Sequence, residues 1–532
     1  MDSKTTHVLV GTVLCMVVGM CAGCKDEEEE TPTYRVDRLA EVVPGGAIQW
    51  MVGVDDAAAL RDAVNESARW QRLFDTAMWH DIMLLPGLVS LRRAAAAVSH
   101  LENIPLGQVL VDEMLDGPAL VAVQEPSRAG RDRAFLVVKH LDLSQRNVAS
   151  ALHAWLAGGE EVEVSEPERI TYRRLKQGAL TLCYFQTGDL VVFSNDEGLI
   201  TVAAGLASGV RPESDSIRAR GWLPSFGSGV TLVADFEALG ERAPEWGVVA
   251  ESLGVRGLGV TVPLEGDRVD VVWVPASRSN TAGTHELAGR RYVPQGALAY
   301  VGIASTGVRT FLEHARARWS RELGRELDLS SVAAIAAGLE GEAFYALLGL
   351  STDPSRVGVS QVFGFRLQAD SEVGEPVRTL WNQAFRGPVR ETVLEQDGGA
   401  RLVCAGGAAD PFCFALHRDY LLVGPEGALR QALEVASGRS AGIVDRLASA
   451  TGRHEGAQVV SVAIDLEGLS RALVAHLASM CDDEEMTTAQ VHEVLEPFFG
   501  ALGALGGYGG ELWSTERGRA SGRLLRLRGT AI

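Results

Sequence analysis

Positive charge is scarce in this chain of 532 residues, which has 49 Lys and Arg against 69 Asp and Glu and a formal net charge of −20. This balance disfavours nucleic acid and anionic lipid as binding partners, because both are polyanions. Aromatic residues make up only 6%, but the hydrophobic fraction of 46% is that of a folded protein and excludes a disordered or collagen-like chain. The length predicts two to four domain-sized units.

The chain also lacks an apolar run of the roughly 20 residues that a membrane-spanning helix needs. Its apolar run at Val8–Ala22 is shorter and follows a polar start that carries Lys4, as in a secretory signal peptide. The run ends in Cys21-Ala22-Gly23-Cys24, which resembles a bacterial lipobox. That resemblance implies a signal peptide over residues 1–23 and a lipid on Cys24. An ordinary cleaved signal or a short uncleaved anchor is the alternative.

An acidic segment follows the lipidation site. Residues 24–34 are predicted to form a solvated tether, because Lys25–Thr33 contains four consecutive Glu and no apolar side chain apart from Pro32. Lys25, directly after the cysteine, does not resemble the inner-membrane retention signal of some bacteria. The expected location is therefore the bacterial cell envelope, with the lipid anchor in the bilayer of the outer membrane and the protein facing the periplasm or the cell surface.

Six segments recur in the same order at offsets between 224 and 250 residues. The pairs are Val43–Ala47 and Val293–Ala297, Leu115–Ala119 and Leu339–Ala343, Phe135–Asp142 and Phe363–Asp370, Cys183–Phe185 and Cys413–Ala415, Asp189–Phe193 and Asp419–Val423, and Asp235–Leu239 and Asp465–Leu469. Chance matches would not preserve both order and spacing. The sequence therefore predicts a first repeat over residues 35–276, a linker over 277–290 and a second repeat over 291–532.

Each repeat alternates short strand patterns with helical patterns. Leu180–Phe185 and Asp189–Phe193 predict a hairpin, and the spacing of apolar residues predicts helices over Leu143–Leu156 and Asp196–Ala207. Strands joined by tight turns favour antiparallel pairing. The predicted fold is α+β, with two tandem homologous domains, each a largely antiparallel sheet with helices packed on one face.

The order of these elements is similar to a family of exported bacterial proteins of unknown function. The shared pattern is P-x-G-A, a strand, a helix with a tryptophan, L-[DE]-G, two strands and a helix. It covers nearly all of the chain after the tether, once per repeat. The resemblance implies a duplicated α+β architecture and a location in the cell envelope, and it brings no activity with it.

Motifs for catalysis and metal binding are largely missing. The sequence has no HExxH, no GxxxxGK[ST] and no pair of CxxC motifs, since its single CxxC is the lipobox-like Cys21–Cys24. No catalytic residue, cofactor or metal ligand is therefore predicted. Gly438–Gly442 matches the GxSxG of a hydrolase through Ser440, but it follows a helical pattern, whereas the nucleophile elbow follows a strand. The acidic run Asp482–Glu485 predicts the acidic start of a helix rather than a calcium loop.

The recurrent aspartates have a structural explanation. Asp142 and its partner Asp370, like Asp235 and Asp465, stand where a strand pattern gives way to a helical one. A carboxylate at that point accepts hydrogen bonds from the free N–H groups of the first helical turn. All four are therefore predicted to cap helices.

Two cysteines are candidates for a disulfide. Cys404 and Cys413 flank a predicted hairpin loop and could pair in an oxidising compartment. Cys183 matches Cys413 in the first repeat, but Arg174 stands at the counterpart of Cys404. Buried unpaired thiols are therefore the alternative.

The apolar stretch Trp70–Leu85 offers a candidate surface for an apolar ligand through Trp70, Phe74 and Trp79, with ordinary core packing as the alternative. These features together predict a membrane-anchored lipoprotein with a non-enzymatic binding or scaffolding role, directed at an envelope protein partner or an apolar ligand. An extracytoplasmic hydrolase with a site between the two repeats is the alternative.

Overall fold

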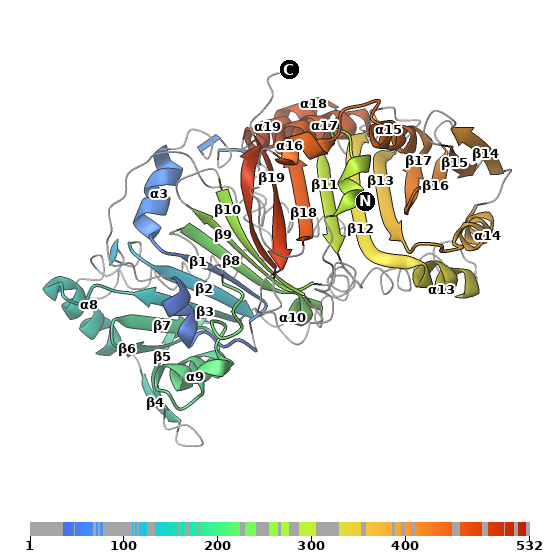
Figure 1. Ribbon diagram of the computed structural model, residues 1–532. Coiled ribbons are helices and arrows are strands. Elements are labelled where there is room, and N and C mark those ends of the chain that lie inside the picture. Colours follow the sequence, from blue (N-terminus) through green and yellow to red (C-terminus); the bar gives the residue numbers. More distant parts are fainter. Residues whose placement is uncertain are drawn as a thin grey trace. The chain divides into compact units, whose positions relative to one another are not determined.

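The computed structural model divides the chain into two compact units (Figure 1). Unit 1 comprises Met1–Pro244 and Gly257–Val272, and unit 2 comprises Glu245–Arg256 and Trp273–Ile532. The structure describes residues 36–46, 48–66, 71–72, 75–77, 109, 112–113, 116–124, 134–157, 160–164, 170–177, 180–223, 229–240, 255–263, 268–275, 287–304, 329–352, 358–385, 389–394, 399–405, 411–448, 458–480, 488–504, 506–514 and 520–527.

Unit 1 is built on an antiparallel sheet. Its strands are β1 (Trp50–Val54), β2 (Ala119–Gln124), β3 (Ala134–His140), β4 (Glu160–Val164), β5 (Ile170–Gln177), β6 (Leu180–Thr187), β7 (Leu190–Ser194), β8 (Gly229–Asp235), β9 (Val255–Pro263) and β10 (Arg268–Pro275). The strand order is β4-β5-β6-β7-β3-β2-β1-β8-β9, and β10 pairs with β9. The predicted hairpin is confirmed as β6 and β7.

Unit 2 has a second antiparallel sheet. Its strands are β11 (Ala299–Ala304), β12 (Leu339–Leu350), β13 (Val359–Leu367), β14 (Val389–Leu394), β15 (Ala400–Ala405), β16 (Phe412–His417), β17 (Tyr420–Pro425), β18 (Gln458–Asp465), β19 (Gly507–Ser514) and β20 (Ala520–Leu527). Their order is β14-β15-β16-β17-β13-β12-β11-β18-β19-β20. The two sheets therefore have the same strand order, with β11 of unit 2 at the place of β1 of unit 1, β12 at the place of β2, and so on to β20 and β10.

Equivalent backbone hydrogen bonds align the two units residue by residue. The amide of Asp235 donates to the carbonyl of Gln49 at 2.7 Å, and the amide of Asp465 donates to that of Leu298 at 2.8 Å. The two proline segments also match, because isolated bridges join Pro44 to Ser216 in unit 1 and Pro294 to Gly442 in unit 2.

The predicted match between Asp142 and Asp370 is wrong by two residues. The amide of Leu141 donates to Asp189, and the amide of Leu367 donates to Asp419, so Leu141 is equivalent to Leu367. The residue equivalent to Asp142 is therefore Gln368. A slip of two residues preserves which side chains face each side of a strand, so the apolar pattern could not reveal it.

Two of the four predicted helix caps take the expected form. A side-chain oxygen of Asp235 accepts from the amide of Ala238 at 3.0 Å at the start of α10 (Phe236–Gly240). Asp465 does the same for Gly468 at 2.9 Å at the start of α17 (Leu466–Met480).

The other two aspartates lie in turns. The side chain of Asp142 accepts from the amide of Ser144 at 3.1 Å, before α8 begins at Arg146. Asp370 has a φ of 63°, in the left-handed region, and lies seven residues after Phe363 in the turn that follows β13. It does not cap a helix, because α14 begins only at Gly374 and Val373 occupies the N-cap position.

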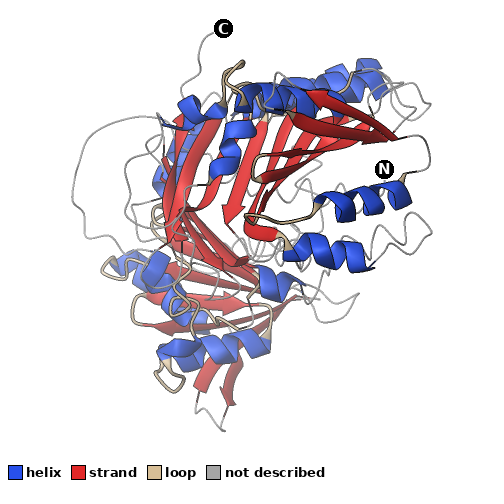
Figure 2. Cartoon of the chain, turned by 45° about the vertical axis from the view of Figure 1, so that its right-hand side comes forward, coloured by secondary structure: helices blue, strands red, loops and turns tan. Residues whose placement is uncertain are grey.

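Helices lie on both sides of the strands (Figure 2). The helical segments are α2 (Val36–Leu39), η1 (Ala40–Val42), α3 (Ala57–Glu66), α8 (Arg146–Ala157), α9 (Glu197–Ala207), η3 (Glu213–Asp215), α10 (Phe236–Gly240), η5 (Ala288–Tyr292), α13 (Leu329–Ala337), α14 (Gly374–Ala384), α15 (Glu426–Ala436), α16 (Ile443–Ala448), α17 (Leu466–Met480), α18 (Thr488–Gln490), the π-helical η8 (Val491–Leu495) and α19 (Glu496–Gly503). No helix among the described residues combines the length and the apolar character that crossing a membrane requires.

The strand β16 shows why helices cover both faces of the sheet. Cys413 and Ala415 point to one face and pack in a core with Leu429 of α15. Phe414, between them, points to the other face and contacts Trp381 of α14. The structure confirms the α+β fold with an antiparallel sheet in each unit, and it adds a helix on the second face, because both faces of these strands are apolar.

Candidate functional site

Several of the predicted site residues lie outside the described residues. These are Cys24, Trp70, Phe74, Trp79 and the acidic run Asp482–Glu485. Cys404 and Cys413 are among the described residues. Their surroundings form the first of three clusters of polar side chains, and the other two are centred on Glu342 and Lys139.

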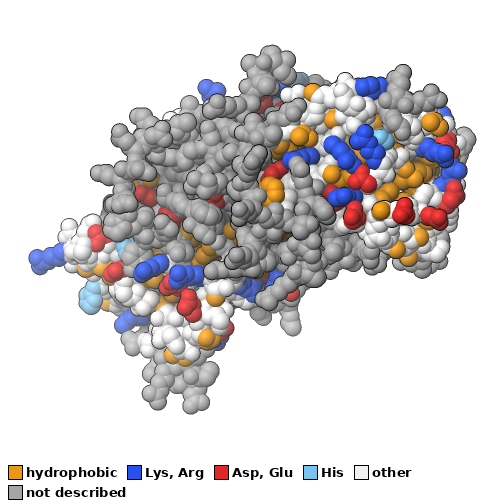
Figure 3. Space-filling view, in the orientation of Figure 1, with side chains coloured by type: hydrophobic (Ala, Val, Ile, Leu, Met, Phe, Trp, Pro, Cys, Tyr) orange, Lys and Arg blue, Asp and Glu red, His pale blue; other side chains and the backbone are white. Residues whose placement is uncertain are grey.

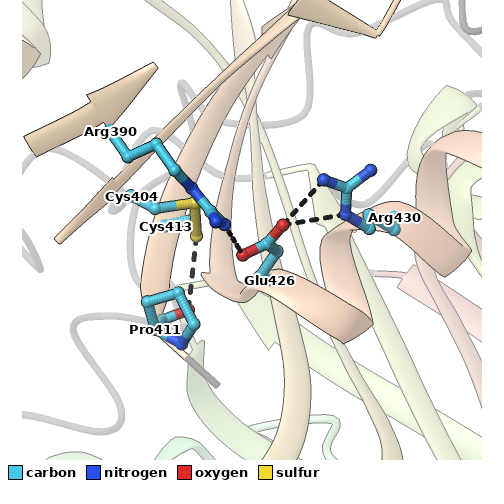
Figure 4. The surroundings of a disulfide bond; sticks show 6 residues. All are labelled: Arg390, Cys404, Pro411, Cys413, Glu426 and Arg430. Atoms are coloured by element: carbon cyan, nitrogen blue, oxygen red, sulfur yellow. Dashed lines mark hydrogen bonds and ion pairs between the residues drawn. A yellow bond between two sulfur atoms is a disulfide. The ribbon is translucent and has the colours of Figure 1, made fainter. Parts of the chain in front are cut away.

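A disulfide joins Cys404 on β15 to Cys413 on β16 (Figure 4). The two residues are direct cross-strand partners, with their Cα atoms 4.1 Å apart. Their side chains are 1% and 0% exposed and belong to the core between the sheet and α15. Because both sulfurs are buried, thiols in solution cannot reduce the bond while the protein is folded. The disulfide therefore has a structural role, which is to link the two strands.

Glu426, the first residue of α15, lies beside this disulfide. Its carboxylate pairs with Arg390 on β14 and accepts from the guanidinium of Arg430 at 2.7 Å (Figure 4). One of its oxygens and the two cysteine sulfurs lie within 4.8 Å of one another, the kind of grouping that could hold a metal ion. The bonded sulfurs are not thiolate ligands and the carboxylate is matched by two guanidinium groups, so we assign no metal site to this group.

Unit 1 replaces the disulfide by a charge pair. Arg174 on β5 lies opposite Cys183 on β6, and its guanidinium pairs with Glu197 of α9 at 2.8 Å. Cys183 is unpaired and buried, and burial raises the pKa of its thiol to about 12. At neutral pH it is therefore a protonated, unreactive core side chain.

A second cluster, the Glu342 cluster, lies at the strand ends of unit 2. The amide of Gly289 donates to the Glu342 carboxylate at 2.7 Å, and Arg366 lies 3.6 Å from the same carboxylate. Arg366 also approaches Glu340 at 2.9 Å and Asp419 at 3.5 Å. Burial raises the pKa of Glu342, against the hydrogen bonds and the cation that favour its charged form.

The start of η5 adds a second ion pair to this region. Arg290 pairs with Glu511 of β19 at 2.5 Å, and these side chains are only 14% and 4% exposed. Arg291 pairs with Asp419, and its guanidinium lies 5.3 Å from the ring centroids of Tyr292 and Tyr420. The cluster therefore ties η5 to three strands, and each of its carboxylates has a cation or an amide donor beside it.

Unit 1 has no equivalent of the ion pair between Arg290 and Glu511. By the alignment of the backbone hydrogen bonds, the positions of Arg290 and Glu511 are taken by Ala40 and Thr261, which are buried. Thr261 instead bonds to Thr231 at 2.8 Å between the hydroxyl oxygens. The strands of unit 1 form without these two charges, so the buried ion pair of Arg290 and Glu511 is found in unit 2 alone of the two sheets.

A third cluster is centred on a buried lysine of unit 1. The ammonium group of Lys139 on β3 donates to the carbonyl of Asp116 and, at 3.1 Å, to that of Pro118. Burial lowers the pKa of this ammonium from 10.5 to about 8, although Glu113, Asp116 and Asp56 oppose the shift. Lys139 therefore holds the turn that contains Gly117, whose φ of 60° favours glycine.

Stability should consequently rise with pH above neutrality. Between pH 8 and 10.5 the unfolded chain holds a proton on Lys139 that the folded chain has released. The free energy of unfolding therefore increases as the pH rises through this range. We expect a gain of about 2 kcal/mol from pH 7.5 to 9.5 that Lys139→Met lacks. Urea denaturation of both proteins measures it. The raised pKa of Cys183 gives the opposite slope above about pH 9 in both proteins, so their difference isolates Lys139, and equal slopes would refute this assignment.

The GxSxG match lies in a helix-end loop, as predicted. α15 ends at Ala436, Gly438 has a φ of 77°, and Ser440 is exposed in the loop that follows. A nucleophile elbow needs a strand before the serine. His476 lies 2.5 Å from the backbone oxygen of Ser351, far away in the chain, and His492 lies 2.8 Å from the carboxylate of Glu496.

Comparison with known proteins identifies no relative. No known protein family matches the chain, and no curated protein matches it. A solved structure, titled "Structure of crystal form I of TP0453", matches 75% of this chain and 96% of its own at 9% identity, with a TM-score of 0.18. A likeness that weak carries no inference about fold or function.

The sequence patterns did not predict the Glu342 cluster or the buried Lys139. Their residues come from segments that are far apart in the chain, such as Arg290 and Glu511. A signal was present, because a lysine within the apolar run FLVVKHL of β3 predicts either a boundary or a buried cation. The recurring segments could also have shown where the two units differ in charge, had the register between them been known.

Proposed function

We propose that this chain is an exported lipoprotein of the bacterial cell envelope, anchored through Cys24, with a non-enzymatic binding or scaffolding role. In this proposal the two units are copies of one ancestral domain, residues 1–23 are removed as a signal peptide and residues 24–34 form the tether. The ligand is an envelope protein or an apolar molecule.

The observation that carries the proposal is the disulfide between Cys404 and Cys413. Buried structural disulfides persist in oxidising compartments and are rare in the cytosol. An oxidising compartment agrees with export. Export is also what the N-terminal apolar run and the lipobox-like Cys21-Ala22-Gly23-Cys24 indicate from the sequence.

The binding role is supported by how the two copies differ. The units share one strand order but not one set of polar residues, since Arg290, Glu342 and Glu511 belong to the second alone. A shared catalytic site would place the same reactive residues in both. Ser440 in its helix-end loop gives the hydrolase alternative no support.

Metabolic labelling with an alkyne analogue of palmitate tests the anchor. We expect the full chain to be labelled and to fractionate with membranes, and Cys24→Ala to abolish the label, because the acceptor thiol is gone. Cys21→Ala is the matched control and keeps the label. An inhibitor of the lipoprotein signal peptidase should leave a precursor that is longer by residues 1–23. A label that survives Cys24→Ala would contradict the proposal.

A further inference from the structure

A row of apolar side chains crosses one face of the sheet in unit 2. The register of the strands places its members directly opposite one another, from β18 through β11, β12, β13 and β17 to β16. We call it the apolar row, and its members are Val462, Val301, Tyr345, Phe363, Val423 and Phe414. Six strands about 4.8 Å apart make it about 24 Å long.

At two adjacent positions, on β13 and β17, this row is less covered than its equivalent in unit 1. There, Val137, Phe193 and Tyr184 are buried, and they pack with Val148 and Leu152 of α8. In unit 2 the residues equivalent to Val137 and Phe193 are Phe363 and Val423, which are only partly buried.

The position of the aromatic side chains on α14 explains the difference. Trp381 stacks on Phe412 at 5.7 Å between ring centroids and meets Phe414 edge-on at 5.2 Å, so this helix sits over β16 at the end of the row. In the region where Figure 1 labels β16, β17 and α14, Figure 3 shows hydrophobic side chains gathered in a hollow with charged side chains around it.

Trp381 brings one polar atom to this apolar end. Its side chain is 8% exposed, and its indole N–H is buried without a hydrogen-bond partner. A buried donor left unpaired costs about 1 to 3 kcal/mol, and native proteins rarely leave one so. An acceptor oxygen on a bound molecule would remove this cost.

The charge beside the hollow limits what that molecule can be. Between β13 and the first turn of α14, the exposed side chains include Asp370, Glu372 and Glu375, whereas the cation of the same helix, Arg378, is balanced by its ion pair with Glu391. The whole chain carries a net charge of −20. A free carboxylate or another anionic head group would be repelled here, whereas an uncharged or zwitterionic head group would not.

We propose that the apolar row binds the acyl chain of an ester lipid whose head group has no net negative charge, with an ester oxygen accepting a hydrogen bond from the Trp381 indole. This rests on the proposed function, because it names the ligand and the site of the binding role. Its residues lie in unit 2, whereas the candidate surface at Trp70, Phe74 and Trp79 belongs to unit 1.

Photo-crosslinking of the full chain in the native envelope tests this proposal. A benzophenone amino acid replaces Phe363, and mass spectrometry identifies what is attached after irradiation. We expect an ester-lipid adduct at this position. The same replacement at Val137, the equivalent residue beneath α8, is the matched control and should give no lipid adduct, because that residue is covered.

Trp381→Phe tests the hydrogen bond without removing the aromatic packing. We expect the yield of the lipid adduct to fall about fivefold, the equivalent of one neutral hydrogen bond, with the folded stability maintained. Free fatty acid as the adduct, lipid at Val137 as well, or an unchanged yield would overturn the proposed contact. A protein adduct at Phe363 would overturn lipid binding but leave the envelope-lipoprotein proposal intact, since Cys24 labelling tests that separately.

Discussion

Replacing Arg290 by methionine is expected to lower the free energy of unfolding of unit 2 by about 3 to 5 kcal/mol. The reason is the charge that remains, because Glu511 is 4% exposed and Arg290 approaches it at 2.5 Å. Without the guanidinium, this carboxylate stays buried without its cation or takes up a proton. Urea denaturation followed by circular dichroism measures the loss.

The first unit supplies the control for this experiment. Replacing both charges by their equivalents there, as Arg290→Ala with Glu511→Thr, removes the buried charge altogether. We expect the double variant to recover most of the lost stability, because Ala40 and Thr261 occupy the same places in an otherwise similar sheet. A double variant as unstable as Arg290→Met would show that the pair contributes through packing rather than through charge.

Removing the disulfide is expected to cost about 2.5 kcal/mol. Cys404 and Cys413 are separated by nine positions, and a bond that closes so short a loop restricts the unfolded chain modestly. The double variant Cys404→Ala with Cys413→Ala measures this by urea denaturation. Cys183→Ala, which removes an unpaired buried thiol at the equivalent position of unit 1, is the control for lost core volume.

A reducing agent gives a second measurement of the same bond. Because both sulfurs are buried, native protein should react slowly with dithiothreitol and react fast once urea opens unit 2. Equal stability of the double cysteine variant and Cys183→Ala, or rapid reduction of the native protein, would contradict the role of the disulfide as a buried link between β15 and β16.

The cysteine pair shows how far the sequence could go. It placed Cys404 and Cys413 on either side of a hairpin loop, but it left paired and unpaired thiols open. Whether two strands bring cysteines into direct opposition depends on register, and a shift of one residue would have pointed one sulfur to the other face. The structure gives that register as Cys404 opposite Cys413.

The short, charged edge strands of each sheet were missed for a related reason. β4 reads Glu-Glu-Val-Glu-Val, and β14 carries Arg390 and Glu391 in its middle. Edge strands expose one side to solvent, so charged side chains are common there and hide the apolar alternation that signals a strand. Only pairing with β5 and β15 identifies them.

Local and recurring sequence patterns predict the α+β class, antiparallel pairing of the strands, the helix caps at Asp235 and Asp465, and the six segments that recur in the same order. Each follows from neighbouring residues, because turns, caps and periodicity act over a few positions. Tertiary structure alone decided the two-residue shift at Asp142, the burial of Arg290 against Glu511 and the partly open apolar row. These depend on contacts between segments far apart in the chain, where packing chooses among registers that the sequence pattern leaves equal.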